Sequence, residues 1–441
     1  MKTVGDVIKI GRDAFYSGQI DRYLDSVRKV GDLIKDLADS DKVDLALNIE
    51  GYWYNNLVKL IESEQAYHNA FQWHYDALWK AGFRRRISLP ARDPRRICFV
   101  IPSGVLLGHT QVMLQIIRAW LRADESIQPC VVSLSDFDGK LDAALKSLGV
   151  TFFAPPGGLG GFAGLAEWCR NIIRQENCNT AVWVSVPVMV SYLFGFGVAP
   201  RQVFWSLKFH PVHLGDSVTH IAMTPPGVGE VLFHGRPWKR FSPPLSIPES
   251  TCRTEDVSRI RNELGASFIF GALARTEKFN SPEYVDTVVD IIKRCSGSVF
   301  VYTGHQDSPL IRARFSEAGL SSAIRFVGWV DTNLYAQALD VFLETFPFGC
   351  GVTGAQAVNA GTRMVSLWQN ETLPRYYFES LGQARALSSR WRIEDDVGEY
   401  ENRAVEFYEQ GNSSASGVSL GLLTSLDNDK ATRFRDLVIG S

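Results

Sequence analysis

The stretch FPFGCGVTGAQAVNAGTRMVSL, residues 346–367, decides how the second half of this chain is organised. It follows the apolar run DVFLETF, carries four glycines and no acidic residue, and ends in the apolar run RMVSL. This pattern predicts a buried strand, a glycine-rich loop, a helix over AQAVNAG and a second strand. Backbone N–H groups at a helix start bind phosphate, and glycine lets a phosphate approach them closely. We therefore expect either a simple turn or a phosphate site in which Thr353 adds a hydroxyl donor.

A second loop of the same kind lies at residues 270–286, FGALARTEKFNSPEYVD. It follows a strand pattern and ends at Ser-Pro-Glu, a typical helix start with Ser281 as N-cap and Pro282 as the first helical residue. Arg275 and Lys278 lie between the strand and the helix. Since both cations follow a strand, they are expected at the edge where a diphosphate would bind. Together the two loops favour phosphate binding over two solvated turns.

Apolar runs that alternate with helical patterns surround these loops. Strands without polar alternation, separated by helices, indicate parallel sheets covered on both faces. The first series comprises residues 97–102, 130–135, 150–155, 180–186, 202–207 and 220–224, and the second comprises residues 267–273, 298–304, 324–330, 334–346 and 363–367. The pattern predicts two doubly wound, Rossmann-like α/β domains that face a cleft, with ligands at the carboxyl ends of the strands.

The N-terminal residues have a different pattern. Apolar positions recur at helical spacing in residues 21–38 and 54–83, and no repeat of about 34 residues is visible. A basic, proline-containing run at 84–96 is typical of a linker, and a proline-rich run at 241–250 ends the first strand series. We therefore expect three domains, which are an all-helical N-terminal domain (1–90), a first Rossmann-like domain (91–250) and a second one with a C-terminal helix (251–441).

The segment FVGWVDTNLYAQALD, residues 326–340, offers a place for a nucleobase. A strand is expected to end at Val330, and a short helix that carries Tyr335 follows it. Backbone groups near Val330 would contact the edge of the base, with the ring of Tyr335 beneath it. Asp331 fits equally well as the N-cap of that helix.

Histidines mark the strand ends of the first domain. His109 lies in a strand-to-helix loop, and His210 and His213 follow the strand at 202–207. Imidazoles suit general-base catalysis, and they are equally common as hydrogen-bonded structural groups. The spacing of three between His210 and His213 also fits a metal pair, but no further ligand cluster accompanies them, so no metal site is expected.

The composition excludes several classes of partner. A net charge of −2 gives no general electrostatic reason to bind nucleic acid or an anionic membrane. The seven cysteines are scattered singly without CxxC spacing, as expected of reduced thiols in a cytoplasmic protein. No signal-peptide pattern and no run of 18 uncharged apolar residues is present, so no transmembrane segment is expected.

These motifs together resemble a known family. The lysine loop, the FVGWVD strand end and the tail LETFPFGCGVTGAQAVNAGTRMVSL are similar to the donor domain of GT-B glycosyltransferases. The resemblance is to the O-GlcNAc transferase group and its bacterial relatives, the soluble adhesin N-glucosyltransferases. In that group an acidic residue and a short Pro-containing loop lead into a Gly/Thr-rich helix start and then AG-T-MV, here Glu344, Pro347, Gly351–Gly354 and Ala360–Val365. WSLKFHPVHLGDSVTH (205–220) is similar to the GHP…TH segment of the bacterial enzymes, which also carry a helical N-terminal domain.

The resemblance implies a metal-independent, inverting transferase without a cofactor. It would move a hexose from a UDP-sugar to a protein side chain, Asn or Ser/Thr. Lys278 would contact the diphosphate, and Gln356 stands where the family has an Asp that holds the ribose. The donor-binding residues would be Lys278, Arg275, Val330, Tyr335, Gly351, Val352, Thr353, Gly354 and Gln356. His210, His213 or His109 would act near the acceptor.

Three alternatives remain open from the sequence. The acceptor could be a glycan or a lipid-linked glycan, in place of a protein. The same fold also carries UDP-sugar epimerases. A non-catalytic scaffold could keep the fold and bind a partner protein through its helical N-terminal region.

Overall fold

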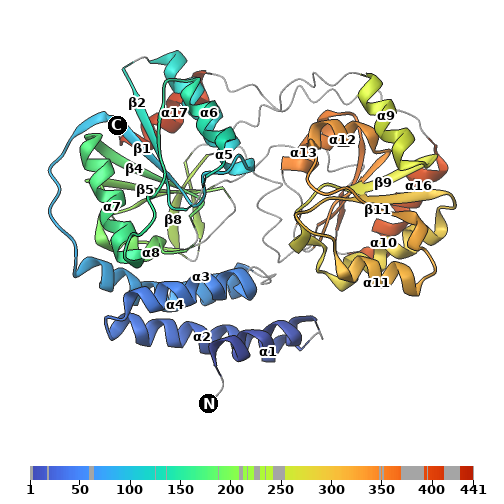
Figure 1. Ribbon diagram of the computed structural model, residues 1–441, viewed down its shortest axis with the longest axis horizontal. Helices are drawn as coiled ribbons and strands as arrows, with labels where there is room; N and C mark the ends of the chain where they lie inside the picture. Colours follow the sequence, from blue (N-terminus) through green and yellow to red (C-terminus); the bar gives the residue numbers. More distant parts are fainter. Residues whose placement is uncertain are drawn as a thin grey trace. The chain divides into compact units, whose positions relative to one another are not determined.

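The computed structural model of the chain divides into two compact units, one of residues 1–244 with 426–441 and one of residues 245–425 (Figure 1). The structure describes residues 3–16, 19–58, 64–124, 126–135, 137–186, 188–207, 212–215, 217–222, 229–233, 235–241, 254–346, 349, 352–368, 392–394, 396–411 and 428–440. The helical segment and the first Rossmann-like region lie in the same unit, where the sequence predicted two separate domains.

The N-terminal segment is helical, as predicted, and the described part of it contains α1 (Val4–Tyr16), α2 (Ile20–Asp39), α3 (Val43–Asn56) and α4 (Glu64–Phe83). Helix α4 packs directly on α8 (Val190–Phe196) of the first sheet layer. A Cβ added to Gly82 would lie 2.1 Å from the carbonyl oxygen of Tyr192, and one added to Gly195 would lie 2.1 Å from that of Trp79. Two facing glycines therefore bring the helix backbones together, which explains why the segment does not form a unit of its own.

A buried carboxylate strengthens this junction. Glu50 of α3 lies 3.0 Å from Nε2 of His74 on α4, and both side chains are fully buried. The second carboxylate oxygen accepts a hydrogen bond from the backbone N–H of Met189, the N-cap residue of α8, at 2.9 Å. Since a negative charge is favourable at a helix start, Glu50 ties the helical segment to the first sheet layer.

The first sheet has the strand order β3-β2-β1-β4-β5-β6-β8-β7, and only β7 runs antiparallel to its neighbour. Its elements are β1 (Asp93–Ile101), α5 (Gly108–Ala123), β2 (Gln128–Ser133), α6 (Gly139–Lys146), β3 (Thr151–Phe153), α7 (Gly161–Gln175), β4 (Cys178–Val184), β5 (Arg201–Ser206), β6 (Thr219–Ala222), β7 (Glu230–Phe233) and β8 (Arg236–Arg240). The central strands are apolar and buried, which is why their sequences show no polar alternation.

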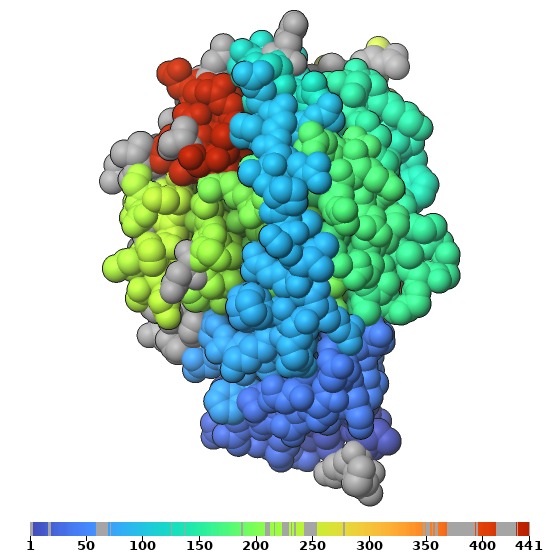
Figure 2. Space-filling model, turned by 90° about the vertical axis from the view of Figure 1, so that its left-hand side faces the viewer, coloured from blue at the N-terminus to red at the C-terminus, as the bar shows by residue number. Residues whose placement is uncertain are grey.

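The C-terminal helix α17 (Asn428–Ile439) belongs to the first unit, although the sequence assigned it to the second domain. The indole of Trp120 donates a hydrogen bond to the Ala431 carbonyl at 2.8 Å, and the Arg201 guanidinium donates one to the Val438 carbonyl at 2.7 Å. Figure 2 shows this helix in red beside the blue and cyan segments of the first sheet layer. The order of the elements along the chain does not predict that the last helix packs against the first sheet layer.

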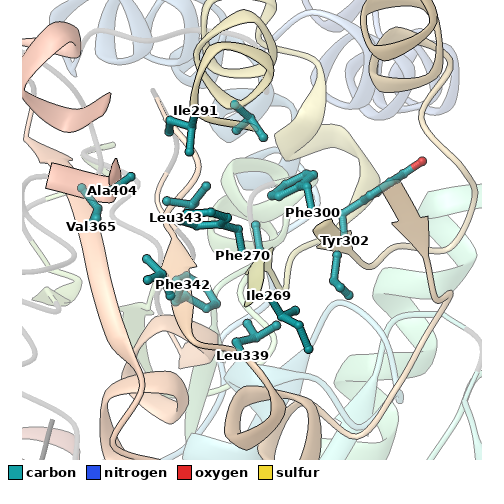
Figure 3. Close-up of a cluster of buried hydrophobic side chains, with 14 of the residues drawn as sticks. Ile269, Phe270, Ile291, Phe300, Tyr302, Leu339, Phe342, Leu343, Val365 and Ala404 are labelled. Atoms are coloured by element: carbon teal, nitrogen blue, oxygen red, sulfur yellow. The ribbon is translucent and has the colours of Figure 1, made fainter. Parts of the chain in front are cut away.

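The second sheet has the order β11-β10-β9-β12-β13-β14, with every strand parallel to its neighbours. Its elements are α9 (Thr254–Leu264), β9 (Phe268–Ala272), the 3₁₀ helix η2 (Thr276–Phe279), α10 (Pro282–Arg294), β10 (Ser298–Tyr302), α11 (Pro309–Glu317), the 3₁₀ helix η3 (Ser321–Ala323), β11 (Ile324–Phe326), α12 (Thr332–Ala338), β12 (Val341–Leu343), α13 (Val352–Asn359), β13 (Arg363–Trp368), β14 (Arg392–Glu394) and α16 (Val397–Glu409). Figure 3 shows Phe270, Phe300 and Leu343 on the side of its core where Ile291 of α10 lies, with Phe342 on the other side, toward Leu339. The predicted class, two Rossmann-like α/β sheets preceded by helices, is confirmed.

Five of the seven cysteines lie among the described residues. Cys98, Cys130, Cys169, Cys178 and Cys295 are free and buried, and Cys252 and Cys350 lie outside the described residues. Burial raises the pKa of Cys98 to about 11. Every described helix is too short or too polar to span a bilayer.

Candidate functional site

The carboxyl edge of the second sheet gathers the loops that the sequence singled out. Strand β9 lies between β10 and β12, and the three strands are parallel. Their carboxyl ends, and the segments that follow them, therefore meet at one edge of the sheet. The lysine loop follows β9, and the glycine-rich stretch follows β12.

A lysine joins these two segments. Lys278 lies in η2, where its backbone N–H donates to the Arg275 carbonyl at 3.0 Å. Its ammonium group donates a hydrogen bond to the backbone carbonyl of Gly349, shortly before α13 begins at Val352. The two residues are 71 positions apart in the chain, so the fold brings the predicted cation to the predicted glycine loop. Arg275 is half-buried in the same loop.

Two threonine hydroxyls fix the lysine loop to the end of β10. Thr303 Oγ1 accepts a hydrogen bond from the Ala274 N–H at 2.7 Å and donates one to the Ala274 carbonyl at 2.8 Å. Thr276 Oγ1 donates to the Gln306 carbonyl at 2.7 Å. The backbone of Gly304 packs against Thr276, and a Cβ added to Gly304 would lie 2.3 Å from the Thr276 hydroxyl oxygen. The φ of 154° at Gly304 is a second reason for glycine at this position. Lys278 thus projects from a loop with little freedom.

The helix start after that loop follows the prediction. The Ser281 side chain accepts a hydrogen bond from the Tyr284 N–H at 3.3 Å, and Pro282 is the first residue of α10. The capping pattern Ser-Pro-Glu was therefore a correct signal for the end of the loop.

The start of α13 carries the other predicted phosphate ligands. Val352 opens the helix, and Thr353 is half-buried in its first turn. Gly354 is buried, and a Cβ added to it would lie 3.1 Å from Cε of Met364 on β13. The missing side chain at Gly354 therefore lets α13 pack on the sheet, a role that the sequence did not reveal. Gly351, Pro347 and Cys350 lie outside the described residues.

A buried carboxylate lies beneath this helix start. Glu344 follows β12, is 2% exposed, and accepts a hydrogen bond from the Ser366 hydroxyl. Its backbone carbonyl accepts a hydrogen bond from the Tyr400 hydroxyl at 3.0 Å. A Cβ on Gly354 would lie 3.9 Å from Glu344 Oε1, so the carboxylate is close to the first turn of α13. The acidic residue that precedes the loop therefore faces the protein interior.

The segment between β11 and α12 is organised by its aspartate. Asp331 Oδ1 accepts hydrogen bonds from the N–H groups of Asn333 at 2.9 Å and Leu334 at 3.3 Å, so the N-cap interpretation of Asp331 is confirmed. Val330 and Tyr335 are half-buried on either side of it, and burial raises the pKa of Tyr335. Both stay candidates for contact with a base.

Two residues of this edge escaped the sequence prediction. The strand was expected to reach Val330, but β11 ends at Phe326 because Gly328 adopts a positive φ of 67°. Trp329 consequently lies in the loop with 59% of its surface exposed. The second is Thr332, whose hydroxyl donates to Oε1 of Gln356 at 2.7 Å and links α12 to α13. A threonine after an N-cap residue gives no such signal in the sequence.

Two of the three predicted histidines, His109 and His213, lie among the described residues of the first unit. His109 is half-buried in the first turn of α5. His213 is held through its backbone by Gln72 of α4, with bonds of 3.0 and 3.3 Å, and its ring stacks on that of His220 at 5.2 Å. His210 lies outside the described residues. In the part of the chain that the structure describes, no group of three or more His, Cys, Asp or Glu side chains could hold a metal ion.

Comparison with solved structures defines the class of fold. The chain has the GT-B fold of nucleotide-sugar glycosyltransferases, so the suspected resemblance is confirmed at the level of the fold. No protein-family model matches the sequence, and no curated protein matches it.

Particular structures share this fold over most of the chain. A mutant of the O-GlcNAc transferase of Thermobaculum terrenum is 17% identical with a TM-score of 0.54, and the match covers 100% of this chain and 95% of that one. HepE of Anabaena, solved with UDP and glucose, is 14% identical with a TM-score of 0.56 over 77% of this chain and 97% of its own. The glycosyltransferase WaaG, involved in lipopolysaccharide biosynthesis, is 10% identical with a TM-score of 0.50 over 78% and 100%.

Proposed function

We propose that this protein is a metal-independent, inverting glycosyltransferase that moves a hexose from a UDP-sugar to the side chain of a protein, Asn or Ser/Thr. The observation that carries the proposal is the hydrogen bond from Lys278 to Gly349, which joins a cation to the glycine loop that precedes α13 in a chain with the GT-B fold. The HepE structure was solved with UDP and glucose, which supports a donor of this class.

The proposed donor site uses a cation and a helix start. On binding, oxygens of the donor diphosphate would replace the Gly349 carbonyl as hydrogen-bond acceptors of the Lys278 ammonium group. The other diphosphate oxygens would accept hydrogen bonds from the N–H groups of Val352, Thr353 and Gly354. Arg275 adds a second positive charge in the same loop. The nucleoside would lie toward Val330, Tyr335 and Gln356.

In the proposed reaction, an acceptor oxygen or nitrogen attacks C1 of the hexose while the bond from C1 to the β-phosphate oxygen breaks. The leaving UDP takes the electron pair, and Lys278 and the α13 amides stabilise the developing charge. The acceptor proton passes to a base, for which His109, His210 and His213 of the first unit are the candidates. Inversion at C1 follows from this single displacement.

The acceptor class is supported by the extent of the structural match. The T. terrenum O-GlcNAc transferase matches the whole chain, including the helical segment, whereas HepE and WaaG match 77% and 78% of it. We infer that the helical segment contributes to binding the acceptor protein.

A panel of UDP-sugars tests the proposal. The purified protein is incubated with each UDP-hexose and with lysate proteins, and UDP release and modified peptides are followed by mass spectrometry. We expect UDP release with one preferred sugar and peptides that gain one hexose on Asn, Ser or Thr. Sugar isomerisation without transfer would favour an epimerase, and absence of both UDP binding and turnover would favour the scaffold.

A further inference from the structure

A side chain of the helical segment holds the backbone of His213. Gln72 lies on α4, and its amide oxygen accepts a hydrogen bond from the His213 N–H at 3.0 Å. The amide NH₂ group of the same side chain donates to the His213 carbonyl at 3.3 Å. A backbone N–H can only donate and a backbone carbonyl can only accept, so these two partners fix which end of the amide is the oxygen. The contact joins residues that are 141 positions apart in the chain.

The residues around His213 are fixed as well. Val212 and Leu214 are 1% and 2% exposed, whereas His213 between them is half-buried. The Leu214 N–H donates to Nε2 of His220 at 3.0 Å, so this nitrogen of His220 carries no proton. The ring of His220 stacks on that of His213 and packs on the other side chain of this cluster, Trp238, at 4.9 Å. His213 is therefore held through its backbone, its neighbours and its ring.

The hydrogen bonds of Gln72 replace those of regular structure. Residues 212–215 belong to no helix or strand, so neither a helix turn nor a sheet ladder holds them. Backbone groups that leave water need hydrogen-bond partners, and a single carboxamide of α4 supplies both partners for His213. The position of this histidine consequently depends on the helical segment.

The helical segment also holds the loop that leads to the next strand end. Between β4 and α8, Ser185 and Met189 adopt positive φ of 51° and 62°, which is rare for residues other than glycine. Glu50 of α3 holds the Met189 N–H, and the Ser185 hydroxyl accepts a hydrogen bond from the Leu207 N–H at 2.9 Å, directly after β5. Backbone strain of this kind is concentrated at functional sites. Contacts from α3 and α4 thus reach the carboxyl ends of two adjacent strands of the first sheet.

We propose that Gln72 is a positioning residue for the transfer reaction and acts by holding His213 where it takes the proton that the acceptor loses. A general base must lie within hydrogen-bond reach of that proton. The helical segment is then a part of the active site, besides its contribution to binding the acceptor protein. The inference rests on the proposed function, because it assumes that His213 is the base among the three candidate histidines.

A double-mutant cycle between the two residues tests the inference. Gln72→Met removes both hydrogen bonds and keeps an unbranched side chain of similar length. Initial rates of transfer would be measured for the wild type, Gln72→Met, His213→Ala and the double variant, with the UDP-hexose and the acceptor peptide that the panel selects. Calorimetry would give the affinity of each protein for UDP. Asp76→Ala, at an exposed position one turn further along α4, is the control.

We expect Gln72→Met to lower kcat by about 10- to 100-fold, the effect of a displacement near 1 Å at a reacting group, and to leave UDP affinity unchanged. In the His213→Ala background the same substitution should have no further effect, because the base that Gln72 positions is absent. Asp76→Ala should transfer at the wild-type rate. In Gln72→Met, the backbone amides of the peptide that carries residues 212–215 should exchange hydrogen faster than in the wild type.

Several outcomes would overturn the inference and leave the proposed function standing. These are a wild-type rate in Gln72→Met, a wild-type rate in His213→Ala, unchanged hydrogen exchange, or losses that multiply in the double variant. A general loss of folded protein would lower the rate equally in both backgrounds, so the cycle separates it from positioning. If the wild type neither binds UDP nor transfers a sugar, the proposed function falls together with the inference.

Discussion

Replacing Lys278 with alanine removes the contact on which the proposed donor site depends. In the free protein the ammonium group donates to the Gly349 carbonyl, so the cation is already directed at the glycine loop. The loop that carries it is fixed by Thr303 and Thr276 through bonds of 2.7 to 2.8 Å. A diphosphate therefore meets a preorganised cation, and little ordering is needed on binding.

The expected loss follows from the exchange of partners. A hydrogen bond between charged groups is worth about 1.5–3 kcal/mol. Lys278 gives up its hydrogen bond to the Gly349 carbonyl when it binds phosphate. The free energy of UDP binding that is lost in Lys278→Ala is therefore only the difference between the two hydrogen bonds, about 1–2 kcal/mol. UDP affinity should therefore fall by roughly 5- to 30-fold. Transfer should fall further, by about 100- to 1,000-fold, since the charge on the leaving group develops in the transition state.

Calorimetry with UDP and initial rates of transfer would measure both effects. Lys293→Ala is the matched control, because Lys293 lies in the same unit and pairs with Asp290 at 3.0 Å on α10. The loss in UDP affinity should shrink as salt rises, since ions screen a partly exposed contact. Wild-type affinity and turnover in Lys278→Ala would refute the donor-site assignment.

Three further predictions concern the rest of the molecule. His213→Ala should lower transfer by about 100-fold while UDP affinity changes little, and equal losses in both would move His213 to the donor side. Gly195→Ala, whose Cβ would lie 2.1 Å from the Trp79 carbonyl, should destabilise the fold by about 1–3 kcal/mol in urea, and an unchanged midpoint would contradict the close helix packing. Stability should fall between pH 9 and 11, because burial raises the pKa of Cys98 to about 11 while the unfolded thiol ionises near 9.0. In Cys98→Ala the free energy of unfolding should fall less steeply with pH than in the wild type, by up to about 1.4 kcal/mol per pH unit. The same slope in both proteins would argue against a buried thiol.

The sequence predicted the fold where the signal was local and repeated. Apolar runs between helical patterns gave both parallel sheets, and the Ser281–Pro282 pair located a helix start. The positions of α17 and of the helical segment depended on long-range contacts, such as the bond of Trp120 to Ala431 and the facing pair Gly82 and Gly195. Local sequence patterns do not show which residues far apart in the chain will be in contact.

The candidate site was predictable in its parts but not in its connections. The lysine loop and the glycine loop each had a recognisable pattern, and their meeting through Lys278 and Gly349 follows from the adjacent strands β9 and β12. The packing role of Gly354 against Met364 and the bond of Thr332 to Gln356 join side chains whose pairing depends on tertiary structure. The roles of the histidines in transfer remain predictions.

Photoaffinity labelling tests the central claim most directly, since it locates the donor on the chain. The protein is irradiated with 5-azido-UDP-glucose, digested, and the labelled peptides are identified by mass spectrometry, with excess UDP as competitor. The account predicts UDP-competable labelling of peptides that carry Val330, Tyr335 or Gln356, at the carboxyl edge of the second sheet. Competable labelling confined to the helical segment or the first sheet, or labelling that UDP does not suppress, would contradict it.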